Sequence, residues 1–274
     1  MTILLLGFVL VLSLSTTNAA AESNECIQGE ELATQAYLQS FDDFELTYFD
    51  GRGLAEVPRT LFATAGQIYK DYRLSGEDFN ALKNTGDFKT NLNRVPILNH
   101  NGAVIGQSSA ISRYLAQQFG MYGRNTKEAA QIDSLCEHII DIKAAFRKLF
   151  PYKVEQTTEE KAINHDIWFN TEPLPELEGR KNRQLQWFLE TMEGILGSDG
   201  FSVGGRPSLA DAYLFNLLGE EATELGDKGE GWFSNRQGTD RVLALYPKLD
   251  AVVETFKFSP GMQTYLTTRG DMKF

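Results

Sequence analysis

The stretch FELTYFDGRGLAEVPR, from Phe44 to Arg59, decides how the first half of the chain is interpreted. Its apolar run, Phe44 to Phe49, has the length and composition of a short β-strand. A glycine-rich corner follows and leads directly into a helical pattern from about Leu54 to Ala65. Pro58 falls early in that helix, where backbone amides lack helical partners anyway. Tyr48 therefore lies at the end of a strand, beside a turn and the start of a helix.

Further strand and helix patterns follow this stretch. A second strand is expected near Gln67 to Tyr72, and RVPILNHNGAVIGQ gives two short strands joined at Asn99 to Gly102. Asn101-Gly102 favours a hairpin turn, because both residues tolerate positive φ. The run QSSAISRYLAQQFG then predicts a helix that is capped by Ser108 or Ser109. The order βαβ followed by ββα predicts a thioredoxin-like fold.

The second half of the chain is predicted to be all-helical. A long helix opens at Thr126, with apolar residues spaced by three or four, and another carries Leu185 to Met192. Ser208 and Asp211 form a capping box at the start of a third helix. We therefore predict an α/β domain at residues 44–122 and an all-helical domain at residues 123–274.

The N-terminus has the pattern of a secretory signal. Residues 1–21 carry no charge, and their apolar run from Ile3 to Leu14 is too short to span a bilayer. Residues 1–21 are therefore interpreted as a signal peptide, and the polar residues 22–43 as an N-terminal extension. This predicts the secretory pathway or secretion, with the cytoplasm as the alternative, and no stable membrane span once the signal is removed.

Composition and charge exclude several classes of function. The net charge is −11, with 37 acidic against 26 basic residues, so a nucleic-acid-binding surface is not expected. Cys26 and Cys136 are the two cysteines, and none of the three histidines lies three or four residues from another. These numbers and spacings predict neither a disulfide framework nor a metal site.

Four stretches together carry a resemblance to a known family: LTYFDGRGLAE, VPIL, QSSAISRYL and SLADAYLF. On their order and spacing, the chain resembles the soluble glutathione S-transferases, most closely the sigma class that includes glutathione-dependent prostaglandin D synthases. The resemblance covers about Phe44 to Tyr265. It implies a detoxification enzyme that joins glutathione, its co-substrate, to a hydrophobic electrophile. Two alternatives stay open, namely a prostaglandin isomerase and a non-catalytic binding or structural protein such as a lens crystallin.

The resemblance also implies a separate role for each of the two domains. Residues 44–122 would bind glutathione, whereas residues 123–274 would bind the second substrate and form a homodimer. Tyr48 matches the catalytic tyrosine of the family. The thiol of glutathione has a pKa of about 8.5, and lowering that pKa by two units requires about 2.7 kcal/mol. A hydrogen bond from the Tyr48 hydroxyl to the sulfur would stabilise the thiolate, and no metal is expected to take part.

Other residues are implied to bind the γ-glutamyl group and the peptide group of glutathione. Gln107 and Ser108, at a helix start, match the pair that binds the γ-glutamyl group, because free amides there attract a carboxylate. Val95 and Pro96, joined by an expected cis peptide bond, would bind the ligand's own peptide group.

The glycyl end of glutathione and the dimer interface involve charged residues. Lys83 and Arg94 could meet the glycyl carboxylate, and Asp141 matches an acid that reaches the γ-glutamyl amine across the dimer. Phe79 replaces a tryptophan common in sigma enzymes, and Leu54 replaces an arginine that some carry. The complete predicted glutathione site consists of Tyr48, Phe49, Arg52, Phe79, Lys83, Arg94, Val95, Pro96, Gln107, Ser108 and Asp141.

Overall fold

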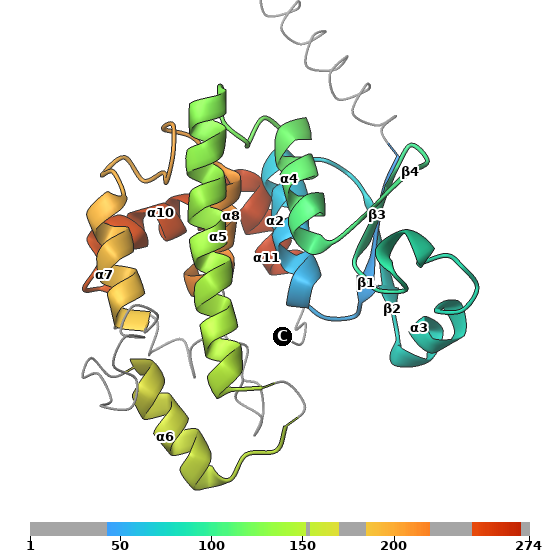
Figure 1. Cartoon of the computed structure of the whole chain (residues 1–274). Coiled ribbons are helices and arrows are strands. Elements are labelled where there is room, and N and C mark those ends of the chain that lie inside the picture. Colours follow the sequence, from blue (N-terminus) through green and yellow to red (C-terminus); the bar gives the residue numbers. More distant parts are fainter. Residues whose placement is uncertain (1–42, 152–153, 170–184, 220–242, 270–274) are drawn as a thin grey trace, which may run out of the picture.

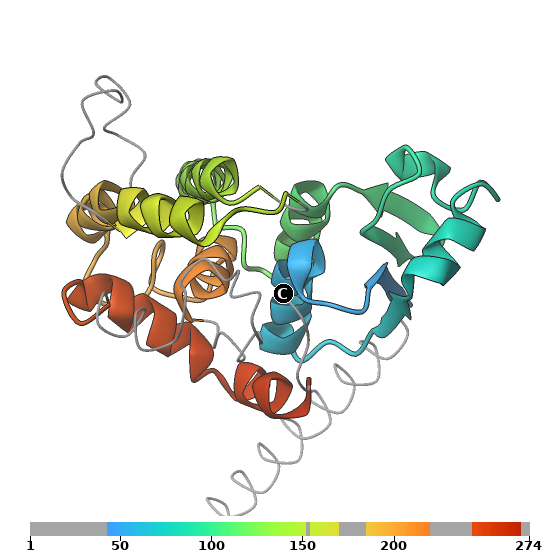
Figure 2. The same cartoon turned by 90° about the horizontal axis from the view of Figure 1, so that it is seen from below.

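The computed structural model describes residues 43–151, 154–169, 185–219 and 243–269. An α/β domain lies beside a larger group of helices (Figure 1), and the view from below shows the same arrangement (Figure 2). The predicted signal peptide, and all of the predicted extension except Asp43, lie outside the described residues. No helix in the described ranges is both long enough and apolar enough to cross a bilayer.

The α/β domain contains one sheet of four strands in the order β2-β1-β3-β4. Strand β1 (Phe44–Phe49) runs parallel to β2 (Lys70–Leu74) and antiparallel to β3 (Ile97–His100). Strand β4 (Ala103–Gly106) pairs antiparallel with β3. The predicted hairpin is confirmed, and Asn101 and Gly102 have φ angles of 50° and 86°.

Helices cover both faces of this sheet. The 3₁₀ turn η1 (Gly53–Ala55) leads into α2 (Glu56–Ala65), and α4 (Ser108–Gln118) lies beside α2, between the sheet and the helical domain (Figure 1). Helix α3 (Gly76–Leu82) lies on the opposite face. This is the predicted thioredoxin-like arrangement.

Strand β2 begins three residues later than the predicted start at Gln67. Helix α2 ends at Ala65 and is capped by Gly66, which is left-handed with a φ of 65°. The amide of Gln67 then donates to the carbonyl of Phe62 at 3.0 Å. Gln67 therefore completes the end of the helix and cannot begin the strand.

One local prediction about the helices in this domain is corrected, and one helix was missed. The N-cap of α4 is Gln107, with a φ of 69°, and no side chain caps the helix. Capping by Ser108 or Ser109 is therefore wrong, because the chain already turns at Gln107 and Ser108 is the first helical residue. Helix α3 was not predicted. Ser75 and Asp78 hold it with a capping box, but none of its seven residues is fully buried, so its apolar signal is weak.

The helical domain is built around α5 (Thr126–Leu149), which begins at the predicted residue. It packs on α8 (Leu209–Leu214), which is buried along its whole length and continues into the π-helical turn η5 (Phe215–Gly219). The remaining helices are α6 (Thr158–Phe169), α7 (Leu185–Ile195), α10 (Pro247–Lys257) and α11 (Pro260–Thr268). Helix α6 was not predicted; among its described apolar side chains Trp168 is buried, whereas Ile163 is 59% exposed.

One cluster of buried apolar side chains connects the two halves of the protein. It extends from β1, α2 and α4 into α5, α8 and α10. Leu46 is fully buried in it. A second, smaller cluster lies on the other side of the sheet and consists of Leu74, Phe88, Val95 and Ile97. The end of β1 lies between these two clusters.

Candidate active site

The register of the sheet brings three parts of the predicted site together. Thr47 of β1 pairs with Ile97 of β3, and Ile97 pairs with Gly106 of β4. The residues next to this row are Tyr48, Pro96 and Gln107. They lie at one end of the strands, which we call the edge of the sheet. The strand end, the proline turn and the start of α4 are therefore neighbours, although nearly sixty residues separate the first from the last.

The hydroxyl of Tyr48 is held by the corner that follows it. Its oxygen accepts a hydrogen bond from the amide of Leu54 at 3.2 Å. Because that bond uses an oxygen lone pair, the hydroxyl proton can still be donated elsewhere. Accepting one hydrogen bond also polarises the hydroxyl and makes it a stronger donor. The geometry suits a group that donates to an anion at the edge of the sheet.

Gly53 allows the backbone to approach Tyr48 this closely. Its φ is 41°, and a Cβ at this position would lie 2.6 Å from the Tyr48 oxygen. A contact this short cannot be accommodated without a shift of the ring or the corner. The absence of a side chain at residue 53 is therefore part of the site.

We expect Gly53→Ala to destabilise the protein more than a matched change at Gly66. Gly66 also has a positive φ, of 65°, but a Cβ there would meet nothing within 4 Å. Gly66→Ala should cost about 1 kcal/mol through backbone strain, and Gly53→Ala about 1–3 kcal/mol more through the clash. Urea unfolding of the two variants measures the difference. Equal losses would show that the contact with Tyr48 imposes no constraint.

Aromatic side chains line the site beside Tyr48. The ring of Phe49 lies edge-on to Tyr48 and to Phe79, with centroid distances of 5.4 and 5.0 Å. Phe79 in turn stacks on Phe88 at 5.8 Å. Phe49 and Phe79 are half-buried and pack on the smaller apolar cluster. The structure therefore brings the predicted residues Phe49, Phe79 and Val95 into one wall.

The turn before β3 is held by a residue that the sequence did not single out. The Val95-Pro96 peptide bond is cis, as predicted, and both residues precede the paired part of β3. The side-chain amide of Asn91 donates to the carbonyl oxygens of Arg94 and Pro96, both at 3.0 Å. Asn91 is 4% exposed but lies in a polar run with several other asparagines, so no sequence signal distinguishes it.

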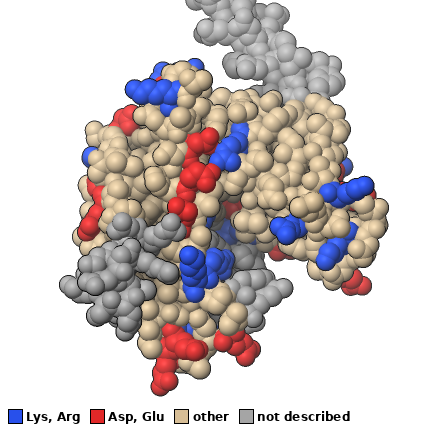
Figure 3. Space-filling view, viewed as in Figure 1, with Lys and Arg blue, Asp and Glu red and all other residues tan. Residues whose placement is uncertain are grey.

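The predicted basic residues lie on the surface of the α/β domain. Lys83 follows α3, Arg94 precedes Val95, and both are exposed, as is Lys89. Figure 3 shows Lys and Arg side chains gathered on this part of the molecule, at the right of the view. A chain with a net charge of −11 therefore has a local basic region there. Ligand binding by Lys83 and Arg94 stays a prediction.

The structure argues against direct contact between Arg52 and glutathione. Arg52 lies in the corner after Tyr48, but it is only 1% exposed. A side chain that is buried to this extent presents no surface to a ligand at the sheet edge. Gln107 is exposed and Ser108 is half-exposed, so both remain accessible at the start of α4.

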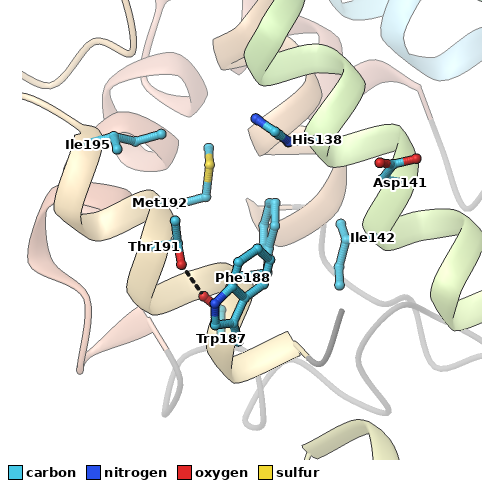
Figure 4. Close-up of a pocket in the computed structure, with 8 residues that line it drawn as sticks. All are labelled: His138, Asp141, Ile142, Trp187, Phe188, Thr191, Met192 and Ile195. Atoms are coloured by element: carbon cyan, nitrogen blue, oxygen red, sulfur yellow. Dashed lines mark hydrogen bonds between the residues drawn. The ribbon is translucent and has the colours of Figure 1, made fainter. Parts of the chain in front are cut away.

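Asp141 lies apart from the other predicted residues, in a cavity of about 420 Å³ between α5 and α7. Figure 4 shows His138, Asp141 and Ile142 on α5, across from side chains of α7 that include Trp187. The described residues that line the cavity all belong to these two helices. Within one chain, Asp141 therefore does not belong to the Tyr48 site, and its predicted role depends on a second chain.

Two other observations limit the chemistry of the described residues. They contain no group of three His, Cys, Asp or Glu side chains that could hold a metal ion. Cys136 is buried, and burial raises the pKa of its thiol, so this cysteine is not a ready nucleophile.

The fold and the site together match one class of protein, and comparisons with known proteins agree. Residues 44–117 match the family description "Glutathione S-transferase, N-terminal domain", and residues 141–269 match "Glutathione S-transferase, C-terminal domain". The chain belongs to the glutathione S-transferase family.

Individual relatives span nearly the whole family fold. Hematopoietic prostaglandin D synthase of Gallus gallus is 38% identical over 215 residues, which is 77% of this chain and 92% of that protein. Glutathione S-transferase 4 of Caenorhabditis elegans is 30% identical over 84% of this chain and 98% of that protein. The solved glutathione S-transferase from Ascaris lumbricoides has a TM-score of 0.61 and 27% identity, covering 85% of this chain and 100% of that one.

Proposed function

We propose that this protein conjugates glutathione to hydrophobic electrophiles, with Tyr48 stabilising the glutathione thiolate. The observation that carries this proposal is the bond from the Leu54 amide to the Tyr48 oxygen, which leaves the hydroxyl proton for the sulfur. At neutral pH only a few per cent of free glutathione is ionised, because its thiol pKa is about 8.5. A donor at the sulfur raises that fraction, and the thiolate is the attacking species.

The sheet edge offers complementary groups for the rest of glutathione. The free amides at the start of α4, with Gln107 and Ser108, suit the γ-glutamyl carboxylate. The backbone of Val95 lies outside the paired part of β3 and suits the peptide group of the ligand. The basic region with Lys83 and Arg94 suits the glycyl carboxylate. These contacts are our assignment for each end of the ligand.

The side chain of Leu54 supports a hydrophobic second substrate. Its amide contacts Tyr48, whereas its side chain is 58% exposed. An apolar group at this position would contact an electrophile that approaches the sulfur. We therefore propose a sigma-class role in detoxification, which this arrangement and the relatives support.

A homodimer is part of the proposal because of the position of Asp141. Asp133, Glu137 and Asp141 lie four residues apart on α5, and Figure 3 shows a column of acidic side chains along this helix. Asp141 is exposed, and in a dimer it would supply a negative charge to the γ-glutamyl ammonium of the other chain. The uncharged, apolar residues 1–21 lead us to propose that the protein enters the secretory pathway.

A second candidate function is glutathione-dependent prostaglandin isomerisation. The 38% identity to a hematopoietic prostaglandin D synthase favours it. It would use the same thiolate at Tyr48 and differ only in the electrophile. A non-catalytic role is the third candidate, since S-crystallin 4 of Enteroctopus dofleini is 26% identical over 84% of this chain. Retention of Tyr48 in its hydrogen-bonded position favours an enzyme.

A direct assay tests the main proposal. The purified protein should bind glutathione in calorimetry and should accelerate its reaction with an activated aryl halide, with a rate that saturates in glutathione. An unsaturated prostaglandin endoperoxide, supplied in parallel, tests the isomerase. Tight glutathione binding without either reaction would contradict catalysis and support a binding role.

A further inference from the structure

A buried network of charges lies directly behind the Tyr48 corner. Arg59 of α2 is fully buried, and its Nη1 donates to the carbonyl oxygen of Gly51 at 2.7 Å. Its Nε donates to both carboxylate oxygens of Asp71 on β2, at 3.2 and 3.1 Å. Arg59 therefore connects the corner after Tyr48 to strand β2, the outermost strand on that side of the sheet.

Strand β2 restrains the corner at a second point. Arg73 pairs through its Nε with Asp71 at 2.9 Å, and through its Nη1 with Asp50 at 3.2 Å. Asp50 and Gly51 are therefore both restrained by arginines that share Asp71. A corner with glycines at residues 51 and 53 has few side chains with which to restrain itself, so external contacts must define its shape.

The network continues from α2 to the C-terminal helix. The Nη1 of Arg59 lies 3.6 Å from the Oε2 of Glu56, which is also fully buried. The Oε1 of Glu56 accepts hydrogen bonds from the hydroxyl of Tyr265 at 2.9 Å and from the Nη1 of Arg269 at 2.8 Å. Arg269 follows α11 directly and has a side chain that is only 8% exposed.

Helix α11 is closely docked at this place. A Cβ at Gly261 would lie 1.8 Å from the carbonyl oxygen of Ala63, so the first turn of α11 rests directly on the end of α2. Burial, and next the negative charge of Glu56, raise the pKa of Tyr265, which keeps its hydroxyl protonated as a donor. The chain's last described helix is thus joined to the catalytic corner through Glu56 and Arg59.

We propose that Arg59 and Arg269 are positioning residues for thiolate stabilisation by Tyr48, an inference that rests on the proposed function. Arg59 fixes the Gly51 carbonyl directly, and Arg269 fixes Arg59 through the carboxylate of Glu56. Together they set the distance between the Leu54 amide and the Tyr48 oxygen, and so the direction of the hydroxyl proton. Neither arginine contacts the sulfur.

The test measures the thiol pKa of enzyme-bound glutathione from the ultraviolet absorbance of the thiolate. Arg59→Lys keeps the charge but loses the forked contact with Gly51 and Asp71, and should raise that pKa by about one unit. Arg269→Ala should raise it by about half a unit, which lowers the thiolate fraction about threefold at acidic pH. The KM for glutathione should change little, because both residues lie behind the site.

Two further variants separate positioning from general loss of structure. Arg269→Lys can still pair with Glu56 and should recover much of the shift. Arg124→Ala is the control for the loss of an arginine elsewhere; Arg124 also contacts a carboxylate, Glu128 at 3.0 Å, and a carbonyl oxygen, Gly204 at 3.3 Å, although its side chain is 60% exposed. It lies outside the network and should leave the thiol pKa unchanged. Thermal unfolding establishes that each variant is folded, and Arg269→Ala decides the question if Arg59→Lys does not fold.

The outcomes distinguish this inference from the proposed function. A wild-type protein that conjugates glutathione, together with a folded Arg269→Ala whose thiol pKa equals that of the wild type, overturns the positioning role alone. An equal rise in the Arg124→Ala control overturns it as well. A wild-type protein that neither binds glutathione nor conjugates it overturns both.

Discussion

Replacing Tyr48 by phenylalanine is expected to lower the rate of glutathione conjugation about 50-fold at a pH two units below the ordinary thiol pKa, where about half of the thiol bound to the wild type but only about 1% of that bound to the variant is ionised. The ring is retained, so its contacts with Phe49 and the apolar clusters are kept. Only the hydroxyl is lost, and with it the hydrogen bond to the sulfur, which we value at about 2.7 kcal/mol. Affinity for glutathione should change little. Thiolate absorbance and steady-state rates across pH measure the two quantities.

Tyr72 provides the control for this experiment. It lies on the neighbouring strand β2, opposite Thr47, and is 50% exposed. Tyr72→Phe also removes one hydroxyl from the sheet and should alter neither the bound thiol pKa nor the rate. If the thiolate of Tyr48→Phe titrates as in the wild type, Tyr48 is not the group that stabilises the sulfur.

Replacing Asp211 by alanine is expected to reduce the free energy of unfolding by about 3 kcal/mol. Its carboxylate accepts hydrogen bonds from the amide and hydroxyl of Ser208, at 2.7 and 2.8 Å, and from the amide of Ser202 at 2.8 Å. Burial raises the pKa of Asp211 to about 6, and the hydrogen bonds from Ser202 and Ser208 oppose that rise. The variant would leave the Ser208 amide at the start of α8, and the Ser202 amide in the loop before it, without their acceptor. Urea unfolding measures the loss.

The capping box of α3 is the natural comparison for Asp211. Asp78 accepts from the amide and hydroxyl of Ser75, at 3.1 and 2.6 Å, but both residues are exposed. Water can replace these bonds, so Asp78→Ala should cost much less than Asp211→Ala. The rate of conjugation per folded molecule should be unchanged in Asp211→Ala, because the Tyr48 corner is not altered. A similar loss of unfolding free energy in the two variants would mean that burial of the α8 capping box adds nothing to its contribution to stability.

The parts of the fold that could be predicted are those with a local pattern. The strand to Phe49, the Asn101-Gly102 turn, the start of α5 at Thr126 and the Ser208 box all have short-range signals, and the structure contains each of them. Helix α3 and helix α6 have weak apolar periodicity, and the cap of α4 depends on a left-handed Gln107 that composition does not predict. Local signals therefore located the strands around the site better than they located the exposed helices.

The supports of the candidate site could not be predicted, because they depend on contacts between distant residues. Arg59 and Glu56 read as ordinary charged positions of a helix, yet both are fully buried and face Asp71 and Arg269. Arg52 shows the opposite error, since its position in the family motif suggested ligand contact whereas the fold buries it. The position of Tyr48 near the end of a strand could be predicted, because it depends mainly on that strand and the corner beside it, whereas its catalytic role was inferred from the family resemblance and stays a prediction.

The backbone amide and the side chain of Leu54 contribute to the site separately. Its backbone amide, which every residue except proline possesses, holds the Tyr48 oxygen, while its leucine side chain extends into solvent. An uncharged substitution other than proline is therefore expected to keep the hydrogen bond to Tyr48 while it changes the surface that a second substrate meets. Substrate range could thus vary at this residue independently of the backbone contact that orients the hydroxyl, whereas an arginine here would add a positive charge to the site.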